Sequence, residues 1–127
     1  MASAEEGLRE RLTQDLRAAI KARDRARIAA LRTLAAALDN ATAVPIEGRG
    51  VPMPFPTAEV PRKVLTEDDL RAILLREIAE RHDAVFAFES HGCFEEALGL
   101  RAEIAIFEGY ASEIASEDSG HQPRGAS

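Results

Sequence analysis

The chain has 127 residues, a formal net charge of −6 and a single cysteine. This length fits one domain, and the lone Cys93 excludes an internal disulfide framework and fits a reducing cytoplasm. No apolar run approaches the roughly 20 residues that a membrane-spanning helix needs, and the charged N-terminus lacks the apolar region of a signal peptide. We therefore expect a cytoplasmic protein with no membrane association.

The first part of the chain predicts two helices joined by a short turn. Apolar residues recur every fourth position over residues 4–22, which gives an amphipathic helix one apolar face. Asp24 is a suitable N-cap for a second helix over residues 25–41. Because the junction is so short, the two helices must be neighbours, either as a hairpin or as a kinked pair.

A segment rich in proline and glycine follows. Five prolines and two glycines between residues 44 and 61 exclude a continuous helix there. We expect residues 44–64 to form an exposed loop inserted between two helical units.

The second half predicts two further helices. Thr66 and Asp69 form a variant of the capping box at the start of the third helix, and Gly92 ends it. A fourth helix runs from near Phe94 to near Tyr110 or slightly later, and the small, polar residues 111–127 predict a disordered tail. The expected fold is all-α: antiparallel helical hairpins, a bundle of about four helices, in one domain over residues 1–110.

Charge is distributed unevenly along the chain. Residues 1–40 carry a net charge of +2, whereas residues 65–110 carry −7. Basic residues crowd the junction of the first two helices, where they form either a corner that contacts phosphates or a solvated turn. No aromatic residue lies among them, which argues against base stacking. The candidate RNA-binding residues are Lys21, Arg23, Arg25, Arg27 and Arg32.

Arg81 and Glu103 border the apolar faces of the third and fourth helices. Each lies three residues after one apolar position of its helix and four residues before the next. We expect them to meet across the two helices as a structural ion pair, with Arg32 as another candidate partner. The alternative is a functional pocket built from all three residues.

The sequence shows no catalytic apparatus. It has no phosphate-binding glycine loop and no evident nucleophile beside a base. The metal-ligand types His82, Glu89, His91 and Cys93 cluster in the sequence but lack a standard zinc spacing. We therefore predict no metal site and no cofactor. The residues by themselves also give no indication that the protein is an enzyme.

Several segments, in this order, resemble the N-terminal helical part of the YqeY-like family, which is related to the C-terminal domain of the GatB subunit of tRNA-dependent amidotransferases. The matching segments are DLRAAIKARD (15–24), ALRTLAAAL (30–38), LTEDDL (65–70), REIAERHDAVFAF (76–88), Gly92 and AEIAIFEGY (102–110). Family members usually continue from the tyrosine into a Leu-Pro pair and a second small helical domain. Here Tyr110 is followed by Ala-Ser, so we expect the first helical domain alone, with a longer loop inserted.

The resemblance implies a link to tRNA amidation, because the related amidotransferase domain handles tRNA while the chemistry takes place elsewhere. We therefore expect a non-catalytic accessory domain that contacts tRNA or amidotransferase components; any carbon–nitrogen ligase activity would rest on resemblance only. The alternative is a protein-interaction module, or one that associates into a homo-oligomer, with no nucleic-acid role.

Overall fold

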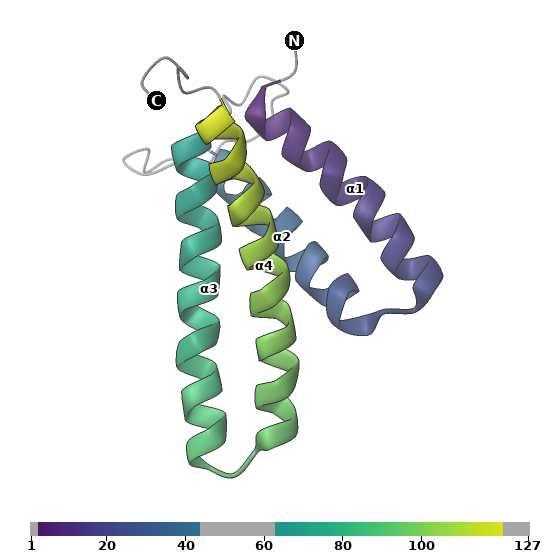
Figure 1. Cartoon of the computed structure of the whole chain (residues 1–127), viewed down its shortest axis with the longest axis vertical. Coiled ribbons are helices and arrows are strands. Elements are labelled where there is room, and N and C mark those ends of the chain that lie inside the picture. Colours follow the sequence, from purple (N-terminus) through teal and green to yellow (C-terminus); the bar gives the residue numbers. More distant parts are fainter. Residues whose placement is uncertain (1–2, 44–62, 121–127) are drawn as a thin grey trace, which may run out of the picture.

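Four helices make up the described part of the chain. The computed structural model describes residues 3–43 and 63–120, with the backbone alone described for residues 115–120. The helices are α1 (Ala4–Ala22), α2 (Arg25–Thr42), α3 (Glu67–Ser90) and α4 (Phe94–Gly120). α1 and α2 form one hairpin, α3 and α4 form a longer one, and α2 crosses behind α4 (Figure 1). The prediction of an all-α fold built from antiparallel hairpins is confirmed.

None of these four helices is both long and apolar enough to cross a bilayer. Most of the predicted loop, residues 44–62, lies outside the described part. Its two flanks are tied together, because the amide of Lys63 donates to the carbonyl oxygen of Thr42 at 2.9 Å. Leu65, which follows, is buried, and its amide donates to Glu5 on α1 at 3.0 Å.

Complete capping boxes start α1 and α3. Ser3 accepts from the amide of Glu6, and the Glu6 side chain accepts from the amide of Ser3. Thr66 and Asp69 exchange the same pair of bonds at the start of α3, as the sequence predicts. Each box satisfies two backbone donors that the first turn of a helix leaves free, so both helix starts are fixed by local sequence.

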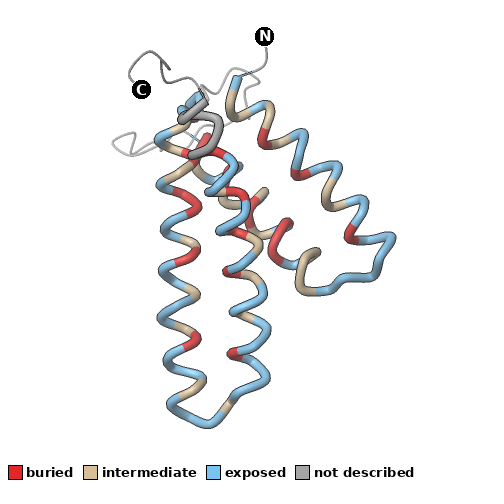
Figure 2. The backbone as a smooth tube through the Cα atoms, in the orientation of Figure 1, coloured by how far each residue is buried: buried red, intermediate tan, exposed pale blue. Residues whose placement is uncertain are grey.

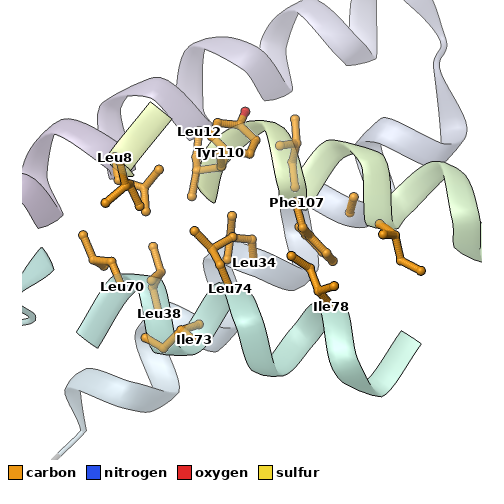
Figure 3. Packing of buried hydrophobic residues seen from close by; sticks show 14 of the residues in the cluster. Leu8, Leu12, Leu34, Leu38, Leu70, Ile73, Leu74, Ile78, Phe107 and Tyr110 are labelled. Atoms are coloured by element: carbon orange, nitrogen blue, oxygen red, sulfur yellow. The ribbon is translucent and has the colours of Figure 1, made fainter. Parts of the chain in front are cut away.

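One hydrophobic core joins all four helices. The apolar residues at its centre are fully or almost fully buried and come from each helix in turn (Figure 3). Phe107 of α4 is the largest of the side chains with no exposed surface, and it packs in a core otherwise built mainly of leucine and isoleucine. Burying such side chains contributes roughly 1.5–3 kcal/mol each. The labelled residues are Leu8, Leu12, Leu34, Leu38, Leu70, Ile73, Leu74, Ile78, Phe107 and Tyr110.

The fourth helix extends further than the predicted end near Tyr110 or slightly later. α4 continues to Gly120, so residues 111–120 of the predicted disordered tail are helical, and residues 121–127 lie outside the described part. The apolar positions continue at helical spacing through Tyr110 to Ile114, which is only 6% exposed. This packing against the core stabilises a helix whose small and polar sequence favours it weakly.

The α3–α4 hairpin is longer than the α1–α2 hairpin, and its far half projects beyond it (Figure 1). The turn of the projecting half is made by Gly92, whose φ of 77° suits a residue without a Cβ. Figure 2 shows how little of this half is buried. Among residues 79–103 only Val85 and Ala97 belong to the core. The projecting half is therefore a two-helix structure with almost no core of its own.

Two matched phenylalanine substitutions test this division. Phe107→Ala removes a fully buried ring and is expected to lower the free energy of unfolding by roughly 3–5 kcal/mol. Phe94→Ala removes a ring that is 62% exposed in the projecting half, and the expected change is within about 0.5 kcal/mol. Urea unfolding followed by circular dichroism measures both, and equal losses would contradict the placement of the core.

Candidate nucleic-acid interface

The turn between α1 and α2 is short and tightly bonded. Arg23 has left-handed backbone angles, φ 58° and ψ 37°, and its amide donates to Ile20 at 3.1 Å. The amide of Asp24 donates to Ala19 at 3.0 Å, and the Asp24 side chain caps α2 by accepting from the amide of Arg27. A left-handed residue with a Cβ costs roughly 1–2 kcal/mol, which these bonds offset. The hairpin alternative of the sequence analysis is therefore the one observed.

The predicted basic residues gather around this turn. Lys21, Arg23, Arg25 and Arg32 are exposed. Arg27 differs, because it is partly buried and its Nε lies 3.7 Å from a carboxylate oxygen of Asp24. Four of the five candidates are thus available to a ligand, and the fifth is held against its own helix cap.

Ion pairing distinguishes this turn from the rest of the described chain. Arginines on the other surfaces form ion pairs at 2.6–2.9 Å, each with at least one carboxylate: Arg9, Arg11, Arg71, Arg81 and Arg101. Within the described residues, the cations with no ion pair are Arg17, Lys21, Arg23, Arg25, Arg32 and Arg76. All but Arg76 lie between positions 17 and 32. We call the set Arg17, Lys21, Arg23, Arg25 and Arg32 the basic corner.

Arg17 is the member of the basic corner that the sequence candidates omit. It is exposed on α1 and lies four residues before Lys21, so the two side chains share one face of the helix. The i,i+4 spacing of Arg17 and Lys21 is the sequence pattern that could have identified Arg17 as a candidate. Arg25 and Arg32 share a face of α2 in the same way, about two turns apart.

The chemistry of the basic corner suits a polyanion. Residues 15–32 contain six Lys or Arg and two Asp, a net charge of +4 in a chain whose total is −6. Unpaired guanidinium and ammonium groups bind phosphate oxygens without distinguishing bases. The exposed aromatic residues of the described chain lie on the other hairpin, so this corner offers no stacking surface.

Arg81 and Glu103 form an ion pair across the α3–α4 hairpin. The Nε of Arg81 donates to Glu103 at 2.8 Å, and its Nη1 donates to Glu77 at 2.8 Å. The guanidinium also lies 4.7 Å from the centre of the Phe107 ring. Burial lowers the pKa of Arg81, but its hydrogen bonds to Glu103 and Glu77 outweigh that effect and raise the pKa overall.

Arg32 takes no part in this cluster. It is exposed on α2, and no ion pair joins it to Arg81 or Glu103 in the described residues. Within the described residues, no ion pair therefore supports the alternative pocket built from those three residues.

Two polar contacts that the sequence did not reveal join α1 to α4. Tyr110, which is 4% exposed, donates its hydroxyl hydrogen to Asp15, and Arg11 forms an ion pair with Glu113 at 2.6 Å. Burial raises the pKa of Tyr110, and the bond to Asp15 raises it further. Such contacts between residues about 100 positions apart leave no periodic signal in the sequence.

The four residues whose side chains could bind a metal ion, His82, Glu89, His91 and Cys93, are not grouped at one site. Glu89 is bonded to Arg101 at 2.6 Å, and the His91 ring bonds the Ala87 carbonyl oxygen at 2.9 Å. In the described part of the chain, no three His, Cys, Asp or Glu residues are grouped so that they could hold a metal ion. His82 is exposed on α3, and Cys93 is partly buried in the turn that follows this helix.

The fold and the basic corner define a small all-α protein made of two helical hairpins with segregated charge. Residues 9–121 match the family described as Yqey-like protein, and the chain belongs to that family. No curated protein and no solved structure matches the chain.

The Arg81 cluster makes a prediction about stability. Glu103→Leu should lower the free energy of unfolding by roughly 1–2 kcal/mol, because Glu77 still pairs with Arg81. Adding Glu77→Leu leaves the half-buried charge unpaired and should bring the total loss to roughly 3–5 kcal/mol. Glu89→Leu is the control, since it breaks an exposed pair worth less than about 1 kcal/mol. Urea unfolding measures all three, and a double variant no less stable than the single one would refute this role.

Tyr110 is the single tyrosine of the chain, so ultraviolet absorbance follows its ionisation directly. In the folded protein the phenol should remain protonated above pH 10, whereas in urea it should titrate near its ordinary pKa of about 10. Because the folded state holds the proton more tightly, the stability from this group is fully present below about pH 10 and falls as the pH rises further. Asp15→Asn should lower the folded-state pKa. Ionisation of the folded protein near pH 10 would disprove the burial of this hydroxyl.

Proposed function

We propose that this protein is a non-catalytic helical module that contacts tRNA, alone or within a tRNA-amidation complex, through its basic corner. The observation that carries the proposal is the concentration of exposed, unpaired cations around one turn of an otherwise acidic chain. An acidic protein repels nucleic acid over most of its surface. Binding would therefore be confined to the corner, which fixes how the protein is oriented on the RNA.

The form of the corner supports contact with a nucleic-acid backbone. Cations lie on both arms of the turn, with Arg17 and Lys21 on α1 and Arg25 and Arg32 on α2. At about 1.5 Å per residue, Arg25 and Arg32 are separated by roughly 10 Å along the helix, so the two arms can contact several phosphates at once. The bonded turn between them reduces the entropy lost on binding.

The choice of tRNA among polyanions comes from the family. YqeY-like proteins resemble the tRNA-handling tail domain of an amidotransferase subunit, and that domain carries no amidation chemistry. The basic corner likewise brings together only guanidinium and ammonium groups with the carboxylate of Asp24, which is occupied in capping α2. These groups hold a substrate rather than transform it.

Binding of bulk tRNA to a pair of matched variants tests the proposal. Lys21→Gln/Arg25→Gln/Arg32→Gln should raise the Kd at least about tenfold and reduce the slope of log K against log salt by roughly 2–3. Lys63→Gln/Arg76→Gln/Arg101→Gln removes the same charge from the other hairpin and its flank, and should change the Kd less than about threefold. Fluorescence anisotropy at about 50 and 150 mM salt measures both.

Absence of binding to the unaltered protein at low salt would reject the proposal. Equal losses in the two variants would show general charge attraction instead of a site at the corner. Either outcome would leave the alternative, a protein-interaction or self-associating module with no role in binding nucleic acid.

A further inference from the structure

The projecting half of the α3–α4 hairpin exposes large apolar side chains that its fold does not use. Phe86 is 74% exposed, Phe94 62% and Leu98 66%. Isolated exposed apolar residues are common, but a cluster of them marks an interaction surface. The first question is whether these three side chains lie together.

The pairing of α3 with α4 brings the three exposed apolar side chains to the same height along the hairpin. Arg81 is bonded to Glu103 across the hairpin. Five residues further along α3 is Phe86, and five residues back along α4 is Leu98, so antiparallel helices place them opposite each other. Phe94 lies one turn from Leu98 on the same side of α4.

Helix geometry also turns them to one face. Phe86 directly follows the buried Val85, and Leu98 directly follows the buried Ala97. Each step along a helix rotates the side chain by about 100°. Val85 and Ala97 face the opposite helix of the hairpin. In two antiparallel helices, the residue that directly follows such an inward-facing residue points to the same side of the hairpin in both helices. Phe86, Phe94 and Leu98 therefore form one surface, which we call the tip face.

Asp83 and Glu95 flank the tip face, since each lies three residues before one of its apolar residues, Phe86 and Leu98. Glu80, Asp83, Glu95 and Glu96 are exposed and, among the described residues, have no ion-pair partner. The two arginines of residues 77–103 are both already bonded to carboxylates. Two arginines against seven Asp or Glu give this segment a net charge of −5. The tip face is thus an apolar patch inside a negative field.

The negative charge around the tip face favours one class of binding partner over the others. Nucleic acid and anionic membranes are repelled by it, although the exposed rings alone would suit either. The tip face of a second copy carries the same negative charge. The basic corner of a second copy has the opposite charge but offers one large exposed apolar side chain, Ile20, against three. A helix with an apolar stripe and basic flanks satisfies both features at once.

We propose that the tip face is a docking site for a basic amphipathic helix of another protein. Apolar residues at helical spacing in the partner would pack on Phe86, Phe94 and Leu98. Lysine or arginine on both flanks would pair with Asp83 and Glu95. The site lies on the other hairpin from the basic corner, so the protein could hold a partner protein and an RNA at the same time.

The probe is a labelled 18-residue peptide of leucine and lysine whose order gives one apolar helix face. A peptide of the same composition in scrambled order keeps the charge and loses that face. We expect the amphipathic peptide to bind at least about tenfold more tightly, a difference of about 1.4 kcal/mol. Equal affinities would mean charge attraction alone and would overturn the proposal.

Two matched double variants locate the site. Phe86→Gln/Leu98→Gln should weaken binding of the amphipathic peptide at least about tenfold, whereas Ile20→Gln/Val64→Gln, which changes exposed apolar residues elsewhere, should leave it within about threefold. If the first variant fails to fold, Asp83→Asn/Glu95→Gln tests the same surface, and it should weaken binding and reduce its salt dependence. Equal effects of the two apolar variants would reject the site.

Sedimentation of the unaltered protein completes the test. The proposal expects a monomer at the concentrations used for peptide binding. Self-association that the Phe86→Gln/Leu98→Gln variant abolishes would overturn the choice of occupant, since a second copy would then cover the tip face. No arm of this experiment uses RNA, so its outcome is independent of the tRNA test.

Discussion

The difference in length between the two hairpins is the constraint on which the rest of the structure depends. α1 and α2 have 19 and 18 residues, whereas α3 and α4 have 24 and 27. Only part of the long hairpin can therefore pack on the short one, and the hydrophobic core is confined to that part. The remaining part is held by contacts between α3 and α4 themselves. Ion pairs across the hairpin, such as Arg81 with Glu103 and Arg101 with Glu89, connect the two helices where the hydrophobic core is small.

Charge is also divided between the two hairpins. In the long hairpin, carboxylates outnumber arginines and hold each of its cross-hairpin arginines in a pair, which leaves an acidic surface around exposed apolar rings. At the α1–α2 turn the order is reversed, because cations outnumber carboxylates and most of them stay unpaired. The two hairpins thus present surfaces of opposite charge, and neither is part of the core. Taken together, our two proposals describe a protein that brings two different partners together.

Much of the fold could be predicted because its signals are local. The capping residues Ser3 and Thr66 act within one turn of their helices, and the apolar stripes fix which sides are buried. The end of α4 could not be predicted in this way. Ile114 is buried because it belongs to the core that the packed helices form, and the polar residues around it carry no helix signal strong enough to show that. The contact between Tyr110 and Asp15 was missed for the same reason.

The sequence by itself determined the helices, the turn chemistry and the excess of cations between positions 17 and 32, because propensity, capping and charge depend on neighbours along the chain. Only the tertiary structure decided which charges remain available. Arg27 forms an ion pair with Asp24, Arg17 is exposed, and Arg81 forms ion pairs with Glu77 and Glu103. It also decided that Phe86 and Leu98 remain exposed. Ion pairing and exposure depend on distances across the fold, and those distances exist only once the helices have packed.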